Sequence, residues 1–220
     1  MHVVFALYEA VTALDLVGPY QVFSMAPNTR VTLAASEAGP KRTAYGMVIH
    51  AERALRDVID ADLIVVPGTG QPNVPLADEG LIGWLRTQGP KAKWTCSVCT
   101  GSLLLGAAGL LRGRRATTHW LAHNALREFG AEPVHERVVF DGNVVTGAGV
   151  SAGIDMALSV LARVADDDTA RAVQLGIEYD PQPPFQSGSV QRAEPHVVEL
   201  ATRLLMEASA RYTELSKAIP

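Results

Sequence analysis

The sequence predicts an α/β protein with a mostly parallel β-sheet. Short apolar runs alternate with segments in which apolar residues recur at helical spacing, a pattern typical of βαβ units. Four apolar runs are expected as buried strands: 2–8 (HVVFALY), 30–36 (RVTLAAS), 62–68 (DLIVVPG) and 93–98 (KWTCSV). The chain has 220 residues, of which 48% are hydrophobic and 19% charged, so we expect one globular domain with a substantial core.

The remaining elements follow in chain order. Helical spacing is present between the strands at 76–88 and 102–111, and after them at 151–165, 167–179 and roughly 194–210. Further strands are expected at 115–118, 132–141 and 143–147. The pair Asp141-Gly142 predicts a tight hairpin between the last two strands. Ser151 and Asp167 are expected as helix N-caps. The segment 180–190 (DPQPPFQSGSV) is expected to be irregular, because its prolines and glycine interrupt both helices and strands.

Composition and charge argue against several classes of protein. The formal net charge is -4, the pI is about 5.9, and lysine and arginine are not concentrated in any stretch, which argues against a nucleic-acid partner. The apolar runs are too short to span a bilayer. The N-terminal stretch MHVVFALYEAV lacks the features of a signal peptide, and with two cysteines three positions apart we expect a reducing cytoplasm.

Ligands of open α/β sheets bind at the carboxyl ends of the strands. That rule selects four loops: 9–19 (EAVTALDLVGP), 67–73 (PGTGQPN), 99–101 (CTG) and 147–151 (GAGVS). All residues to which we assign chemistry lie in or next to these loops.

Cys99 is the candidate nucleophile. It stands where a predicted strand turns into a helix, with Gly101 just past it, as in a nucleophile elbow with cysteine in place of serine. We expect the N-terminus of the following helix to favour the thiolate. The alternative is that Cys99 is a small buried hydrophobic residue.

Cys96 is expected to lie in the core. It falls inside the strand, about 10 Å from Cys99 by the rise of an extended chain, which is too far for a disulfide. Neither a second C-x-x-C nor a Cys/His pair at finger spacing is present to complete a zinc site.

Asp15 and Thr100 are the candidate partners of Cys99. Asp15 lies between two leucines in the first loop, where an apolar setting would raise its pKa and suit it to proton transfer. The alternative for Asp15 is a cap on a helix that begins after Pro19. Thr100 follows the cysteine directly and is expected to hydrogen-bond the sulfur or an intermediate.

The other polar motifs are less specific. His119 and His123 have an i, i+4 spacing, but the glutamate of a zincin motif is missing, so we expect a capped or pocket-lining His119 and a solvated His123. The loop P-G-T-G resembles a phosphate loop only in part, and its amides could instead face an anionic intermediate.

The longer motifs resemble the DJ-1/PfpI superfamily, and within it the bacterial isocyanide hydratases. The resemblance rests on LDLVGP, SVCTGSLLLGAAGLLRGRRATTHW, VHERVVFDGNVVTGAGVSAGIDMAL and QLGIEYDPQPPFQSGS, and it extends to about residue 190. It implies a flavodoxin-like three-layer sandwich that forms a homodimer. We therefore expect a DJ-1/PfpI-like domain at 1–190 and, at 191–220, a C-terminal helix packed on the same domain.

The resemblance also implies site residues. Cys99, Asp15 and Thr100 are the implied catalytic residues, and the candidate substrate-binding residues are Gly68, Thr69, Gly149, Val150, His119 and Trp120. Thr100 stands where many proteases and deglycases of the superfamily have histidine. Thr69 stands where many members have the second glycine of Pro-Gly-Gly, which costs this loop backbone freedom.

The implied reaction is hydration of an isocyanide to an N-substituted formamide, without metal or organic cofactor. Cys99 would form a thioimidate, while a protonated Asp15 donates a proton and then activates water as the carboxylate. The alternatives are a cofactor-free glyoxalase or deglycase, a ligand-sensing domain of the kind fused to transcriptional regulators, and a redox sensor in which Cys99 is oxidised. About 30 residues after position 190 are too few for a helix-turn-helix pair.

Overall fold

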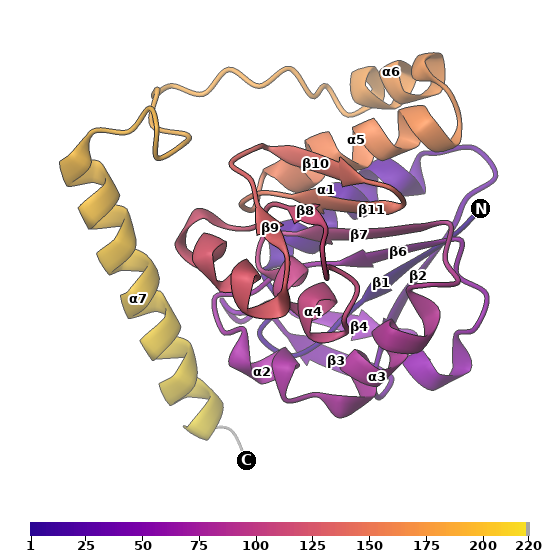
Figure 1. Cartoon of the computed structure of the whole chain (residues 1–220), viewed down its shortest axis with the longest axis horizontal. Coiled ribbons are helices and arrows are strands. Elements are labelled where there is room, and N and C mark those ends of the chain that lie inside the picture. Colours follow the sequence, from indigo (N-terminus) through magenta and orange to yellow (C-terminus); the bar gives the residue numbers. More distant parts are fainter. Residues whose placement is uncertain (219–220) are drawn as a thin grey trace. The chain divides into compact units, whose positions relative to one another are not determined.

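The computed structural model describes the backbone of residues 1–218 and the side chains of residues 1–212 (Figure 1). The chain divides into two units, Met1–Ile177 and Glu178–Pro220. The first unit contains the sheet and the candidate site, and the second contains an irregular segment followed by helix α7 (Pro195–Ala218). The division falls before residue 190, and the expectation that the C-terminal helix packs on the domain stays a prediction.

The first unit is built on a seven-stranded sheet with the strand order β10-β11-β7-β6-β1-β2-β5. Its strands are β1 (His2–Ala6), β2 (Arg30–Ala35), β5 (Arg53–Ala54), β6 (Leu63–Val66), β7 (Trp94–Val98), β10 (Val138–Asp141) and β11 (Val144–Gly147). All neighbouring strands are parallel except β10 and β11, which form the hairpin that Asp141-Gly142 predicts. Gly142 has a φ of 61°, which the tight turn requires.

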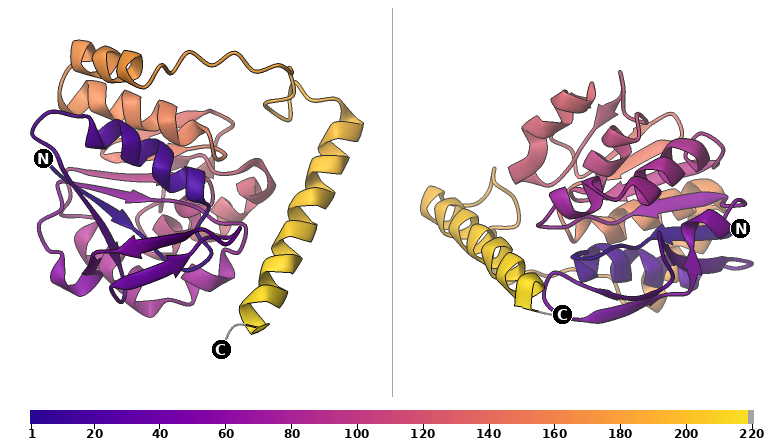
Figure 2. Two further views of the ribbon diagram at one scale, coloured as in Figure 1. Left: turned by 180° about the vertical axis from the view of Figure 1, so that it is seen from behind. Right: turned by 90° about the horizontal axis from the view of Figure 1, so that it is seen from below.

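Helices cover both faces of this sheet, which confirms the predicted α/β three-layer sandwich with a mostly parallel sheet. One layer holds α1 (Ala13–Ser24), α5 (Ala152–Val164) and α6 (Asp167–Gly176), and the other holds α2 (Asn73–Leu76), α3 (Glu79–Gln88) and α4 (Gly101–Ala107) (Figure 1). Helices α1 and α5 run side by side (Figure 2). A Cβ on Gly18 of α1 would lie 2.9 Å from the Ile154 side chain of α5, so this close approach needs a glycine.

Smaller elements surround the sandwich. They are the hairpin β3 (Gly39–Arg42) with β4 (Val48–Ala51), the short pair β8 (Arg115–Ala116) with β9 (Glu132–Pro133), and the 3-10 helices η1 (Leu55–Asp57) and η2 (Trp120–Phe129). The β3–β4 hairpin was not expected. The strand expected at 132–141 is divided into β9 and β10.

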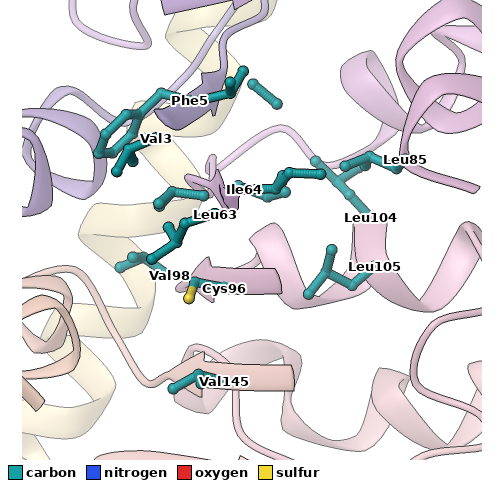
Figure 3. Packing of buried hydrophobic residues seen from close by; sticks show 14 of the residues in the cluster. Val3, Phe5, Leu63, Ile64, Leu85, Cys96, Val98, Leu104, Leu105 and Val145 are labelled. Carbon is teal, nitrogen blue, oxygen red and sulfur yellow. The ribbon is translucent and has the colours of Figure 1, made fainter. Parts of the chain in front are cut away.

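The core lies between the sheet and its helices, and Cys96 is part of it (Figure 3). Cys96 is fully buried among apolar side chains, and burial raises the pKa of its thiol far above the ordinary value. Both cysteines are free thiols. The prediction that Cys96 is a core residue is therefore confirmed.

Helix ends account for most of the local differences from expectation. Ser151 occupies the N-cap position of α5 but makes no side-chain cap, and its hydroxyl accepts a hydrogen bond from Arg137 at 3.3 Å. The N-cap of α6 is Asp166 rather than Asp167, since the Asp166 carboxylate accepts from the amide of Thr169 at 2.7 Å. The final helix begins near the expected residue and continues to Ala218.

Candidate active site

The four selected loops follow β1, β6, β7 and β11, which are neighbours in the sheet. Because parallel strands end at the same edge, these loops converge on one region. Three of the loops meet at Gly68: a Cβ built there would lie 2.5 Å from the amide nitrogen of Thr100, and 2.8 Å from both the Asp15 Oδ2 and the Cys99 Cβ. The structure therefore brings Asp15, Cys99 and Thr100 together around a glycine that has no room for a side chain.

Cys99 has the strained backbone of a nucleophile elbow. Its φ is 56°, a left-handed conformation that non-glycine residues seldom adopt. The Cys99 amide donates to the carbonyl oxygens of Gly147 and Ala148, at 3.1 and 2.8 Å. The Cys99 carbonyl oxygen accepts from the hydroxyls of Thr118, at 2.9 Å, and Ser102, at 3.2 Å. Four hydrogen bonds thus hold this conformation in place.

Asp15 lies in the first turn of α1, not in a loop as expected. The N-cap position of α1 is Thr12, and Pro19 lies inside this helix. The alternative that Asp15 caps a helix that begins after Pro19 is therefore wrong. The Asp15 carboxyl is completely buried, its Oδ2 accepts from the Gly68 amide at 2.9 Å, and its Oδ1 has no hydrogen-bond partner among the described residues. Burial raises the pKa of Asp15 to about 7, against the lowering effects of the Gly68 amide and the Cys99 thiol.

Cys99 differs from the expectation of a stabilised resting thiolate. Burial and the neighbouring Asp15 raise the pKa of its thiol well above the ordinary value. Hydrogen bonds from the amides of Thr100 and Val150 to the sulfur act in the opposite direction but are weaker in sum. The thiol of Cys99 and the carboxyl of Asp15 are therefore an electrostatically coupled pair.

Thr100 is brought to the site, but its hydroxyl does not face the sulfur. The hydroxyl donates to the Thr69 carbonyl oxygen and accepts from the Thr69 amide, each at 2.7 Å. The Gly68 amide is likewise engaged, with Asp15. The amides of Gly68 and Thr69 therefore do not point at an intermediate, and the donors around the sulfur are the amides of Thr100 and Val150.

His119 lies beside the loop that follows β11, and Trp120 lies next to His119. A Cβ on Gly149 would lie 3.1 Å from the His119 ring, so the imidazole packs against this loop. His119 is the N-cap of η2, and its Nδ1 accepts from the Leu121 amide. Burial lowers the pKa of His119 and keeps the ring neutral, which fits the expected capped histidine. The Trp120 ring is 5.6 Å from the His119 ring, measured between centroids.

His123 is not the solvated residue that was expected. It is buried, its Nε2 contacts the carbonyl oxygen of Val134 at 3.0 Å, and its ring stacks on His135 with centroids 3.7 Å apart. Over the part of the chain that is described, no three His, Cys, Asp or Glu side chains gather as metal ligands would.

The chain is similar to known proteins over nearly its whole length. Residues 1–163 match the DJ-1/PfpI family. The chain belongs to this family. It is 42% identical to an isonitrile hydratase of Pseudomonas putida over 97% of this chain and 93% of that protein. It is 31% identical to the HTH-type transcriptional regulator CdhR of Pseudomonas aeruginosa over 77% of this chain, but over only 48% of the regulator.

Among solved structures, a THiJ/PfpI family protein of Pseudomonas syringae superposes with a TM-score of 0.90 at 36% identity, covering 97% of this chain and 89% of that one. Like other DJ-1/PfpI proteins of known structure, this chain therefore has the flavodoxin-like arrangement that the sequence predicts.

Three site residues escaped the sequence analysis. Thr118 and Ser102 hold the Cys99 carbonyl, and Tyr8 donates its buried hydroxyl to the Pro67 carbonyl oxygen next to Gly68. Thr118 lies in the recognisable motif RATTHW, which was one available signal. Tyr8 follows β1 in a position where any apolar residue would fit the pattern, so no signal marked it.

Proposed function

We propose that this DJ-1/PfpI protein is an isocyanide hydratase, which converts R–N≡C and water into the formamide R–NH–CHO. The observation that carries the proposal is the buried pair of Asp15 and Cys99. The pair can supply one nucleophile and one proton to the same carbon, as addition to an isocyanide requires. The similarity to an isonitrile hydratase over nearly the whole chain supports the same reaction.

The first step adds Cys99 to the substrate. Asp15 accepts the thiol proton, and the sulfur forms a bond to the terminal carbon of the isocyanide. The same proton passes from Asp15 to that carbon, which gives the thioimidate R–N=CH–S–Cys99 with no net gain or loss of protons. The amides of Thr100 and Val150 stabilise the sulfur while its charge develops.

The second step consumes water. The Asp15 carboxylate takes a proton from a water molecule while the oxygen of that water forms a bond to the thioimidate carbon. Asp15 then passes the proton to the thioimidate nitrogen. The tetrahedral intermediate R–NH–CH(OH)–S–Cys99 then loses the sulfur as its hydroxyl proton returns through Asp15, which releases R–NH–CHO and restores the thiol. The unpartnered Oδ1 of Asp15 supports this role, because it is a buried acceptor with no competing donor among the described residues.

Thr100 supports catalysis through position. Its hydroxyl fixes the backbone of Thr69 and its amide faces the sulfur. Gly68, Thr69, Gly149, Val150, His119 and Trp120 remain the proposed wall of the substrate site.

We also propose that the protein is a homodimer. Large apolar side chains are exposed on α1 (Leu14, Val17) and on the β3–β4 hairpin (Tyr45, Met47, Val48). The hairpin is attached beside α1, because backbone hydrogen bonds join residues 42 and 44 to residues 10 and 11. A second copy would cover these side chains, and sedimentation should give a dimer that a glutamate at Val17 or Met47 weakens.

A thiol nucleophile must remain reduced, so we place the protein in the cytoplasm. In the described residues no helix is long and apolar enough for a membrane span.

Steady-state turnover tests the proposed function. The purified protein should convert a panel of alkyl and aryl isocyanides into formamides, detected by mass spectrometry, and the Cys99→Ala variant should not. Methylglyoxal consumed faster than any isocyanide would instead favour a glyoxalase or deglycase. A Cys99 that mild peroxide oxidises, in a protein that turns over neither substrate, would favour a redox sensor.

A further inference from the structure

The peptide group between Pro67 and Gly68 is hydrogen-bonded at both ends. Its carbonyl oxygen accepts from the Tyr8 hydroxyl, and its N–H donates to Oδ2 of Asp15 at 2.9 Å. A single planar amide therefore connects a phenol to the carboxyl that moves the protons of the reaction.

Tyr8 is fixed in this role by its surroundings. It lies just after β1, and only 2% of its surface is exposed. The Pro67 carbonyl oxygen, which accepts the bond from Tyr8, is closely packed as well. Gly101 lies so near that a Cβ on it would be 2.7 Å from this oxygen. Burial raises the pKa of Tyr8 well above its ordinary value, and the nearby charges of Asp15 and Cys99 raise it further. The phenol therefore stays protonated and remains a donor.

A hydrogen bond to an amide oxygen polarises the whole peptide group. The N–H at the other end becomes a stronger donor, and consecutive bonds of this kind strengthen one another by about 10–30% each. Here the strengthened donor faces Asp15, and a stronger bond favours the carboxylate over the neutral acid.

We propose that Tyr8 is a positioning residue that acts on Asp15 through the Pro67–Gly68 peptide and keeps Asp15 able to accept the Cys99 proton. The importance of this effect for turnover rests on the proposed function. The effect on Asp15 itself does not, and can be measured without substrate.

The other ionisable groups around Asp15 do not replace this contact. Cys99 faces Asp15 from the elbow after β7 and is part of the pair. On the neighbouring elements, Asp155 of α5 is paired with Arg137, and the ring of His119 is kept neutral and packs against Gly149. Tyr8 is thus the group outside the pair whose change should move the titration of Asp15.

The test is a pH titration of the Asp15 carboxyl by 13C NMR in the full-length protein, compared between the wild type and Tyr8→Phe. The Asp15→Asn variant identifies the resonance. Removing the hydroxyl should raise the midpoint by roughly 0.3–0.7 pH units. The acid limb of kcat/KM should move by the same amount with KM unchanged, whereas a merely structural defect would lower kcat at every pH. Tyr212→Phe, in helix α7 and outside the unit that contains the site, is the matched control and should leave both profiles unchanged.

A second variant changes the bond in the opposite direction. Replacing tyrosine by 3-fluorotyrosine makes the phenol more acidic and a stronger donor, so the midpoint should fall. The same replacement in Tyr8→Phe should have no effect. Because fluorotyrosine keeps the hydroxyl, this arm remains decisive even if Tyr8→Phe fails to fold. An Asp15 midpoint that stays within about 0.1 unit in both folded proteins would overturn the proposal. A shifted midpoint without isocyanide turnover would uphold the inference while rejecting the proposed function.

Discussion

The hydroxyl of Thr100 both donates to the carbonyl oxygen and accepts from the amide of Thr69, at 2.7 Å each. This pair of bonds attaches the residue after the nucleophile to the loop that carries Gly68. The Gly68 amide in turn donates to Asp15, so the Thr100–Thr69 contact links the elbow that carries the thiol to the loop that holds the carboxyl. We propose on this basis that Thr100 positions the reacting pair, whereas its sequence position suggested a hydrogen bond to the sulfur or to an intermediate.

The Thr100→Val variant should therefore lose activity without losing the fold. Valine has the same shape but leaves the Thr69 amide and carbonyl without their partner, and a displacement of about 1 Å at a reacting group can lower the rate about 100-fold. We expect kcat/KM to fall by roughly 10- to 100-fold. Thr100→Ser retains the hydroxyl and should keep most of the activity. Equal losses in the serine and valine variants would contradict this role.

The Gly68→Ala variant should be nearly inactive. The added methyl group would lie within 3 Å of the Thr100 amide, the Asp15 carboxyl and the Cys99 side chain, so the pair has to separate. Gly70→Ala in the same loop meets nothing within 4 Å and is the matched control. We expect a loss of about 100-fold or more for Gly68→Ala alone, measured as kcat/KM beside the circular dichroism spectrum of each variant. An active Gly68→Ala protein would mean that the site is not as tightly packed as described.

The Asp15→Asn variant should be inactive but more stable at neutral pH. Burial raises the folded-state pKa of Asp15 to about 7, above the ordinary value of 3.8 that applies in the unfolded chain. Between these values the folded protein holds a proton that the unfolded chain releases, so the contribution of Asp15 to stability falls as pH rises from about 4 to about 7. Asparagine does not titrate, so its contribution does not fall with pH. The unfolding free energy of the variant should exceed that of the wild type by an amount that grows from pH 4 to on the order of 2–4 kcal/mol at pH 8.

Urea unfolding of both proteins across this pH range measures the effect. The difference in unfolding free energy should grow steadily with pH and level off above about pH 7. A difference that is the same at every pH would show that Asp15 titrates normally in the folded protein.

Cys96→Ala should separate the two cysteines. The sulfur of Cys96 lies in the core, and its removal leaves a small cavity that should cost about 1–2 kcal/mol of unfolding free energy. Turnover by this variant should stay near that of the wild type, whereas Cys99→Ala should have none. Equal loss of activity in both variants would contradict the division of roles.

Much of the site could be predicted from the sequence because βαβ connectivity makes the strands parallel, so that their carboxyl ends lie at one edge of the sheet. The apolar runs identified β1, β6 and β7, and the rule for open sheets identified the loops that bring Asp15, Gly68 and Cys99 together. The elbow at Cys99 was also predictable, since a cysteine between a strand and a glycine-containing helix start has few other conformations.

Helix α1 could not be predicted. Gly18-Pro19 is typical of a helix end, and the proline cannot donate to the carbonyl of Asp15, four residues earlier. Tertiary packing overrides this local preference, because Gly18 allows α1 to approach Ile154 of α5 closely. The hydrogen bonds of Tyr8, Thr100 and Thr118 also escaped prediction, since each joins residues that are at least 19 positions apart in the chain.

The central claim is that the carbon of the isocyanide becomes bonded to Cys99. Rapid acid quenching of the protein during turnover, followed by peptide mass spectrometry, tests it directly. The peptide that contains both cysteines should gain the full mass of the isocyanide, and fragmentation should place the added mass on Cys99 and not on Cys96. Formamide production at the wild-type rate by Cys99→Ala, with no adduct on the wild-type peptide, would contradict the account.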